Sequence, residues 1–417
     1  MAKQTTYLAS KPRYEILDGL RGVAAMMVVA FHLFESYSRG AAFQIINHGY
    51  LAVDFFFVLS GFVIGYAYDD RWDRMSLGGF FKRRITRLHP MVIAGTVVGL
   101  LMFYFGIDAF RLIGTAPAWK IAVCFILGCL MIPVKPAMDI RGWSETYPLN
   151  GPQWTLMLEY IANILYALVI RHLPKWGLAI CVGLFAVLTL DLTQGWNIFG
   201  LLGRYQGRVI GGWSITPDQL YIGFCRLLYP FFCGLLISRI GRFIKVRGGF
   251  WWCALVLAAL LAMPRIGAAP SFSMAADGTR EFLPGGVKFN GMYEAFVILC
   301  IFPLLVMTGA GSTVSGKSQV FCKFLGDISY PLYITHYPLI YFQMSWLRRH
   351  PILDPTAAEP VAGAVSLGVH IAFSVCIFLL AVGMAWALLK LYDQPVREWL
   401  KEHWLKRPAK NTQPITQ

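Results

Sequence analysis

Long apolar runs recur along the whole chain, and they restrict its fold more than any other feature. A transmembrane helix needs about 20 mainly apolar residues to cross the hydrocarbon core of a bilayer. Only 14% of the 417 residues are charged, whereas a soluble domain contains about 25%, so a soluble enzyme is excluded. We predict an all-α polytopic membrane protein that forms a single domain over residues 1–417. The predicted spans lie near residues 16–36, 49–68, 89–107, 154–170, 176–193, 219–240, 250–266, 292–310, 328–346 and 361–390.

The number of spans depends on one short apolar run near residues 121–133. Its length is that of a re-entrant or interfacial segment, for which about 10–14 residues are typical. If this run crossed the membrane, the basic loop before the third span and the basic loop at 239–247 would face opposite sides. Positive charge collects in cytoplasmic loops, so we predict about ten transmembrane helices, a short segment that does not cross, and cytoplasmic termini. The basic tail 391–417 is then cytoplasmic. Arg348 and Arg349 fall in an outer loop of this topology and are the main evidence against it.

The charge balance and the cysteines exclude several classes of protein. A net charge of +15 would indicate nucleic-acid binding in a soluble protein, but in a membrane protein it reflects cytoplasmic loops. We therefore expect a lipid bilayer and no nucleic acid as partner. The nine cysteines form no C-x-x-C pair and lie mostly in apolar runs, as small buried side chains do. With no H-E-x-x-H motif and no closely spaced His/Cys/Asp cluster, we expect no metal site.

Ionisable side chains inside apolar spans mark candidate functional sites, because each costs a few kcal/mol or more to place in hydrocarbon. Four spans carry such groups, which are His32 and Glu35, Asp54, Glu159, and His336. The predicted depths let all of them face one cavity that opens outward. Each also has a structural interpretation. His32 would be a hydrogen-bonded packing residue, and His336 would have a structural role. Asp54 and Glu159 would pair with an arginine or a helix terminus, and Glu35 would be solvated.

Three arginines are placed to bind phosphate groups. Arg21 and His32 are 11 residues apart, which is about three helical turns plus 20°, so a cytoplasmic cation and a deep imidazole share one helix face. Arg84 and Arg87 lie one turn apart where the third span begins. Guanidinium groups at this spacing can hold phosphates through bidentate hydrogen bonds. The alternative is that these are ordinary cytoplasmic basic residues.

Several separate motifs along the chain resemble those of one known family. They are DGLRGVAAMMVVAFH, GYLAVDFFFVLSGFVIGY, FFKRRITRLHP, WTLMLEY, GDISYPLYITHYPL and YDQPVRE. Together, and in this order, they resemble the acyltransferase 3 family of integral-membrane acyltransferases over nearly the whole chain.

This resemblance implies an activity. Members transfer an acyl group, usually acetyl, from cytoplasmic acyl-CoA to a hydroxyl group of an extracytoplasmic or membrane-associated acceptor, mostly a sugar or glycolipid. The family's Arg/Lys-x10-His motif falls on Arg21 and His32, and its Arg-x-x-Arg motif falls on Arg84 and Arg87. The histidine is the family's proposed catalytic residue, and the arginines are linked to the CoA donor. The resemblance also implies a multi-pass protein of the bacterial cytoplasmic membrane.

Some members append an SGNH-hydrolase-like domain after the membrane part. This chain ends about 27 residues past its last predicted span, so we expect no such domain within it. A separate partner enzyme on the outer side would then finish the transfer where one is needed.

The residues and the resemblance agree on a mechanism. The CoA phosphates would bind Arg84, Arg87 and Arg21, and the pantetheine arm would run inward to His32, so we expect acyl-CoA as a substrate and no permanently bound cofactor. His32 would act as general base on the acceptor hydroxyl or would carry the acyl group itself. Glu35 or a deeper carboxylate would orient the imidazole.

Two other classes compete with this interpretation. A proton-coupled transporter or flippase would use the same intramembrane residues as a proton relay, but it has no evident need for an arginine pair aligned with the deep histidine. A glycosyltransferase that uses lipid-linked sugars would usually bring a large outer loop or a soluble domain. The outer segments here have at most a few tens of residues.

Overall fold

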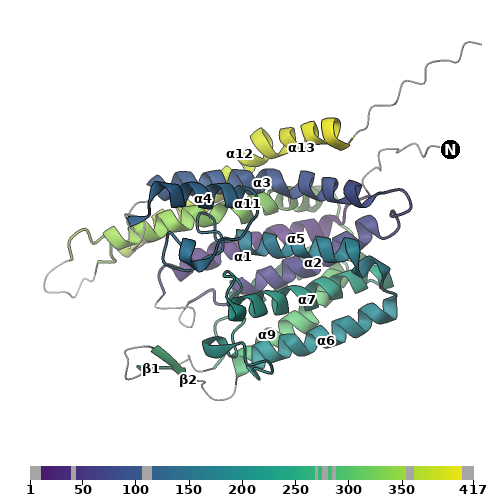
Figure 1. The fold of residues 1–417 in the computed structure, drawn as a ribbon, viewed down its shortest axis with the longest axis horizontal. Helices are drawn as coiled ribbons and strands as arrows, with labels where there is room; N and C mark the ends of the chain where they lie inside the picture. Colours follow the sequence, from purple (N-terminus) through teal and green to yellow (C-terminus); the bar gives the residue numbers. More distant parts are fainter. Residues whose placement is uncertain are drawn as a thin grey trace, which may run out of the picture.

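The computed structural model describes residues 11–38, 44–105, 115–267, 271–274, 280–283, 288–353 and 361–405. The α-helices are α1 (Glu15–Glu35), α2 (Ala52–Tyr68), α3 (Leu77–Phe105), α4 (Ala118–Cys129), α5 (Gln153–Leu168), α6 (Lys175–Gln194), α7 (Pro217–Ile240), α8 (Gly249–Ala262), α9 (Phe289–Phe296), α10 (Phe302–Gly311), α11 (Gly316–Arg349), α12 (Leu367–Leu388) and α13 (Gln394–Leu400). Most helices run along the long axis of the molecule, with α12 and α13 at one edge and α6 and α9 at the other (Figure 1).

Seven helices in the described part of the chain are long and apolar enough to cross a membrane. They are α1, the helix Gly49–Tyr68 that includes α2, α3, α6, α7, the helix formed by α9 and α10, and the helix that begins with α12. The protein is therefore a multi-pass integral membrane protein. The other three predicted spans also form helices, but α5 has 16 residues and α8 has 14. The third, α11, has 34 residues but is less apolar because its middle is rich in tyrosine.

The structure departs from the predicted all-α fold in one place. Strands β1 (Ser271–Met274) and β2 (Arg280–Leu283) form an antiparallel hairpin. The short apolar run near 121–133 forms α4, whose 12 residues span about 18 Å, fewer than the about 20 residues of a typical transmembrane helix. The predicted basic tail 391–417 is helical as far as Leu405, and residues 406–417 lie outside the described part.

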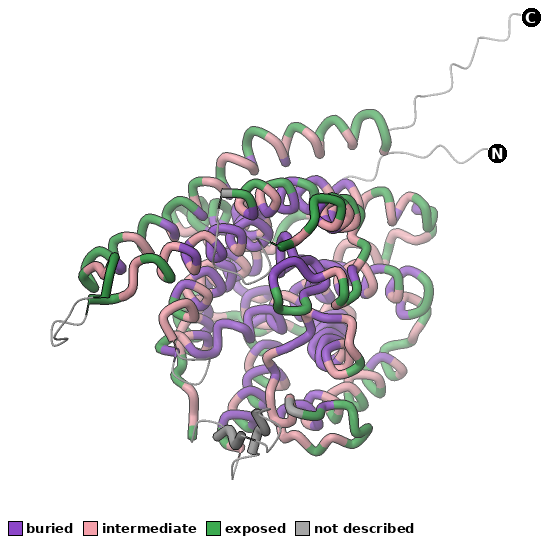
Figure 2. Tube along the Cα trace, turned by 60° about the vertical axis from the view of Figure 1, so that its left-hand side comes forward, coloured by how far each residue is buried: buried purple, intermediate pink, exposed green. Residues whose placement is uncertain are grey.

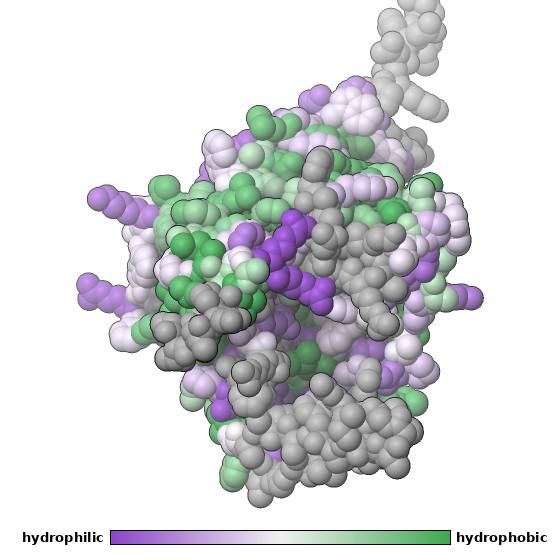
Figure 3. Space-filling model, turned by 90° about the vertical axis from the view of Figure 1, so that its left-hand side faces the viewer, coloured by the Kyte–Doolittle hydropathy of each residue, from purple (hydrophilic) through white to green (hydrophobic). Residues whose placement is uncertain are grey.

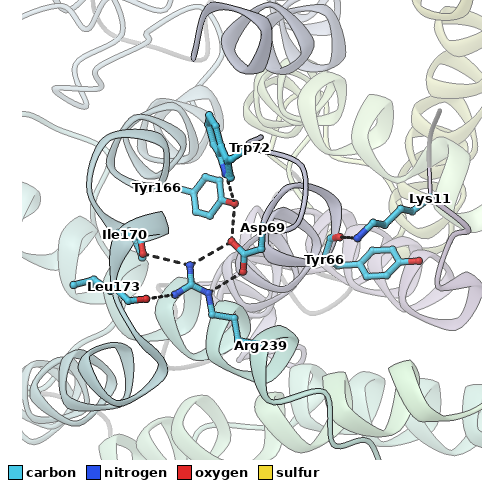
Figure 4. Close-up of polar contacts among 8 residues, drawn as sticks. All are labelled: Lys11, Tyr66, Asp69, Trp72, Tyr166, Ile170, Leu173 and Arg239. Atoms are coloured by element: carbon cyan, nitrogen blue, oxygen red, sulfur yellow. Dashed lines mark hydrogen bonds and ion pairs between the residues drawn. The ribbon is translucent and has the colours of Figure 1, made fainter. Parts of the chain in front are cut away.

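The bundle has two ends. We call one of them the basic end: helices α1, α3 and α11 start there, and helices α2, α5 and α7 finish there. We call the other one the opposite end. Arg239 near the end of α7 donates to Asp69 (2.8 Å) and to the carbonyl oxygens of Ile170 and Leu173 (Figure 4). Tyr166 on α5 donates to the same Asp69 carboxylate at 2.8 Å. This network fixes the ends of α2, α5 and α7 relative to one another.

The buried core runs through the middle of the bundle (Figure 2). Helices α2 and α7 approach closely, because a side chain at Gly61 would meet the backbone oxygen of Phe231, and one at Gly234 would meet that of Val58. Small residues permit such close packing between membrane helices. Helix α1 packs along α11 with Gly22 at the contact. These contacts hold α1, α2 and α11, which carry several candidate residues, in fixed positions.

Candidate active site

A cavity of about 700 Å³ lies between α1, α2, α3, α5, α11 and α13. Its described lining contains nine basic residues and four acidic ones, so the cavity attracts anions. The basic residues are Lys11, Arg13, Arg21, Arg71, Arg83, Arg84, Arg87, Arg397 and Lys401. The three arginines predicted to bind phosphate therefore line one cavity.

These three arginines differ in how they are paired. Arg84 is buried and forms an ion pair with Glu159 (2.7 Å), and Arg21 pairs with Asp18 (3.3 Å). Arg87 is exposed within the cavity and forms no ion pair with any described residue. It lies close enough to Arg84 and Arg21 to be repelled by both. An anion bound among the three guanidinium groups would relieve this repulsion.

Glu159 lies in the same cavity as the arginines. Its carboxylate accepts hydrogen bonds from Arg84 (2.7 Å) and from the Ser60 hydroxyl (3.2 Å). This contact matches the structural alternative for Glu159, an ion pair with an arginine. The carboxylate orients the Arg84 guanidinium, whereas the carboxylate that contacts His32 is Glu35.

The cavity reaches deep into the bundle. Along α2 its lining runs from Tyr68 to Val53, a rise of about 22 Å, which is comparable to the length of an extended pantetheine arm. At the inner end of the cavity, the hydroxyl groups of Tyr333 and Thr155 form a hydrogen bond (2.8 Å). The Tyr333 ring packs edge-on against Phe56, with 5.2 Å between the ring centroids. Tyr333 lies one helical turn before His336 on α11, and their ring centroids are 6.0 Å apart.

His32 and Glu35 form a pair in the last turn of α1, at the opposite end of the bundle. The Nδ1 atom of His32 lies 2.7 Å from Oε2 of Glu35. An ionised carboxylate only accepts hydrogen bonds, so the proton is on Nδ1 and the lone pair of Nε2 is free to act as a base or nucleophile. The same carboxylate–imidazole arrangement orients the histidine of a catalytic triad. The Glu35 side chain is 36% exposed, so the pair is accessible from outside.

His336 lies beside His32. The two imidazole rings stack with their centroids 5.6 Å apart. His336 is fully buried, and its Nδ1 donates to the backbone oxygen of Tyr333 at 2.8 Å. Its Nε2 is buried and has no hydrogen-bond partner among the described residues. The structure therefore places an unpaired basic nitrogen beside the His32–Glu35 pair.

Asp54 lies apart from the other candidates. It is fully buried and pairs with Arg226 on α7 at 2.7 Å, and Arg226 also donates to the backbone oxygens of Tyr50 (2.6 Å) and Gly211 (3.3 Å). We predicted that all the intramembrane groups face one cavity that opens outward. The described residues do not form such a shared cavity. His32 and His336 lie together, Glu159 lines the basic cavity, and Asp54 is sealed in the core.

The intramembrane residues predicted from the sequence omit Arg226 and Glu294. Both lie in predicted spans, so the cost of burying a charge in hydrocarbon would have identified each of them as a candidate functional residue. Glu294 is 2% exposed and accepts hydrogen bonds from the Tyr50 hydroxyl and from Asn290 (3.0 Å). Together with Asp54, these residues form a buried polar network between α2, α7 and α9.

The sequence was compared with families of known proteins. The acyltransferase domain family matches residues 14–406, which is nearly the whole chain and includes both arginine motifs and His32. The chain belongs to the acyltransferase 3 family. It is therefore a multi-pass membrane acyltransferase. No solved structure matches it.

Curated relatives include one protein named as a peptidoglycan O-acetyltransferase and one named as a putative enzyme of this kind. This acyltransferase is 34% identical to the peptidoglycan O-acetyltransferase OatA of Listeria monocytogenes over 82% of the chain and 51% of that protein. It is 26% identical to the putative peptidoglycan O-acetyltransferase YrhL of Bacillus subtilis over 78% of the chain and 48% of that protein. The chain thus spans about half the length of these relatives. It is also 32% identical to Protein 2 in picA locus of Rhizobium radiobacter, over 40% of the chain and 83% of that protein.

Proposed function

We propose that this protein moves an acyl group, usually acetyl, from cytoplasmic acyl-CoA to a hydroxyl of a sugar or glycan on the other side of a bacterial cytoplasmic membrane. The observation that carries the proposal is the deep basic cavity, which begins among arginines and ends one helical turn from His336. In the proposed topology the chain crosses ten times, and the basic end and both termini face the cytoplasm.

The donor would bind with its phosphates among Arg21, Arg84 and Arg87 and with its pantetheine arm along α2. This arrangement uses the excess of positive charge at the cavity mouth, which a proton-coupled transporter or flippase does not require. Glu159 keeps Arg84 in position. A thioester would pass Tyr333 and His336 on its way from the inner end of the cavity to His32.

The chemistry would take place at His32. Its Nε2 accepts the proton of the acceptor hydroxyl while the hydroxyl oxygen bonds to the thioester carbonyl carbon, and the carbon–sulfur bond breaks to release the CoA thiolate. The thiolate finally takes the proton, and the unpaired Nε2 of His336 can carry it inward. Glu35 stabilises the imidazolium that forms. In the alternative, Nε2 of His32 first takes the acyl group from the thioester and then passes it to the hydroxyl.

Turnover in nanodiscs, where both ends of the protein are accessible, tests the proposal. Wild type should release CoA from radiolabelled acetyl-CoA and label a hydroxylated glycan such as chitotetraose. We expect His32→Ala to lower this rate about 10²- to 10⁴-fold, the usual contribution of a general base, with an unchanged melting temperature. His403→Ala, an exposed histidine of the tail, is the matched control. Full activity of His32→Ala, or a wild type that binds the glycan but does not turn over acetyl-CoA, would contradict the proposal.

A further inference from the structure

The loop between α4 and α5 forms a rigid turn at the opposite end of the bundle. The Asp139 carboxylate accepts hydrogen bonds from the backbone N–H groups of Arg141 (2.8 Å), Gly142 (2.9 Å) and Ser144 (2.6 Å). Gly142 and Ser144 have φ angles of 97° and 55°, and a non-glycine residue at positive φ persists only where its surroundings impose it. This turn presents Trp143, whose side chain is 40% exposed.

Buried polar groups form the floor beneath Trp143. The Arg141 guanidinium stacks 3.7 Å above the Tyr341 ring. The Tyr341 hydroxyl donates to Glu145 at 2.9 Å, and a side chain at Gly151 would lie 2.9 Å from the same carboxylate. The Trp143 ring lies beside this packed floor, with its centroid 6.1 Å from that of Tyr341.

A row of rings leads from Trp143 to the candidate catalytic histidine. The centroid distances are 6.1 Å from Trp143 to Tyr341, 4.7 Å from Tyr341 to Tyr337, and 4.7 Å from Tyr337 to His32. The whole row is on the scale of two or three linked sugar rings. Figure 3 views this end of the molecule and shows hydrophilic side chains near its middle, between hydrophobic ones.

Tyr337 lies between Tyr341 and His32 in this row. Its side chain is half-buried, and its hydroxyl makes no hydrogen bond to any residue that the structure describes. The hydroxyl lies within electrostatic reach of Glu35 and Glu145. A ligand in contact with His32 would therefore find a free donor and acceptor beside it.

We infer that the surface from Trp143 to His32, with Tyr337 between them, binds pyranose rings of the acceptor. A pyranose has an apolar C–H face, which stacks on an indole, and a rim of hydroxyl groups, which hydrogen-bond to Tyr337 and Glu35. Trp143 binds one ring and thereby positions the hydroxyl of a neighbouring ring at Nε2 of His32. The inference rests on the proposed function, because it assigns the acceptor side of the same reaction.

Binding and turnover measured separately test the inference. Chitotetraose and maltotetraose are titrated into the wild-type protein in nanodiscs, and binding is followed by saturation-transfer NMR. We expect at least one of them to bind, Trp143→Ala to weaken that binding at least fivefold, and Trp143→Phe to weaken it less. Trp196→Ala is the matched control, because Trp196 is a 55% exposed indole at the same end. Failure of both oligosaccharides to bind, or equal effects of Trp143→Ala and Trp196→Ala, would overturn the inference.

Kinetics separate this site from the donor site. Trp143→Ala and Tyr337→Phe should raise the KM for the glycan at least fivefold and leave the KM for acetyl-CoA unchanged. A rise in both constants would mean that the substitutions only disturb folding, and it would overturn the inference. Oligosaccharide binding without any acetyl-CoA turnover would leave the pyranose site standing and would contradict the proposed function instead.

Discussion

Two of the arginine–carboxylate pairs that the structure describes share a closest N–O distance of 2.7 Å but differ in their surroundings. In the pair Arg226–Asp54 the side chains are 3% and 0% exposed, and the pair is sealed between α2 and α7. In the pair Arg84–Glu159 the glutamate is 21% exposed, and both residues line the basic cavity. An intramembrane ion pair therefore indicates a substrate site only where a cavity reaches it.

The surroundings of the two pairs explain this difference. Arg226 also donates hydrogen bonds to the backbone oxygens of Tyr50 and Gly211. The sealed pair therefore has little capacity to bind a ligand. Beside Arg84, Arg87 is exposed and has no ion-pair partner among the described residues. The first pair stabilises the contact between helices, and the second leaves positive charge available to an anion.

The largest expected effect is the loss of the sealed pair. Asp54→Ala leaves the buried charge of Arg226 unpaired, which usually costs about 3–5 kcal/mol. Glu159→Ala should destabilise the protein less, because water in the cavity can solvate Arg84. Thermal unfolding of both variants in the same detergent measures the difference. Equal losses of stability would remove the distinction between the two pairs.

A double substitution sharpens the same comparison. Asp54→Leu together with Arg226→Met removes both buried charges, and apolar replacement of a whole buried pair is often neutral for stability. We expect this variant to regain stability relative to Asp54→Ala and to keep its acetyl-CoA turnover. Glu159→Leu with Arg84→Met should stay folded but lose donor affinity. Loss of donor affinity in the first double variant as well would place Asp54 in the active site.

Glu145 is another buried carboxylate, in the loop between α4 and α5. Burial raises its pKa to about 7, against the opposing effect of Arg141. The folded state therefore holds this proton more tightly than the unfolded state, so its contribution to stability is present below about pH 4.5 and is lost as the pH rises through 7. From pH 5 to pH 8 the wild type should lose up to about 3 kcal/mol relative to Glu145→Gln. Parallel melting curves for the two proteins over this range would contradict the expectation.

The smallest expected effect concerns Arg87 in the cavity. Arg87→Ala should raise the KM for acetyl-CoA about tenfold, equivalent to about 1.4 kcal/mol, and change kcat little, because the lost contact is common to the ground and transition states. Arg74→Ala is the control, since this exposed arginine does not belong to the described cavity lining. Steady-state kinetics with varied acetyl-CoA concentration measure both effects. Equal effects of the two substitutions would contradict a phosphate site at Arg87.

Much of the fold follows from the order of apolar runs. The predicted span at 219–240 corresponds to α7, and that at 154–170 corresponds to α5, because an apolar run of this length has no stable alternative to a helix in a membrane. The placement of Arg84 and Arg87 in one cavity also follows from local spacing, since residues one turn apart share a helix face. The roles of these residues in binding and catalysis stay predictions.

The contacts between distant segments do not follow from such patterns. Glu159 and Arg84 are 75 positions apart, and nothing in either segment indicates that they pair. The same is true of Tyr337, which lies between His32 and Tyr341 beneath the loop that joins α4 and α5. Only the packing of α1 against α11 brings these rings together.

The sequence by itself determined that the chain crosses a membrane, where its helices lie, and which arginines and histidine share a helix face, because these properties depend on local hydrophobicity and helical periodicity. The tertiary structure decided which buried charges face a cavity and which are sealed. Asp54 and Glu159 look alike in the sequence, as single carboxylates in apolar helices. Their difference depends on side chains from other helices: Arg226 encloses Asp54 in the core, whereas Glu159 and Arg84 face the space between α2, α3 and α5.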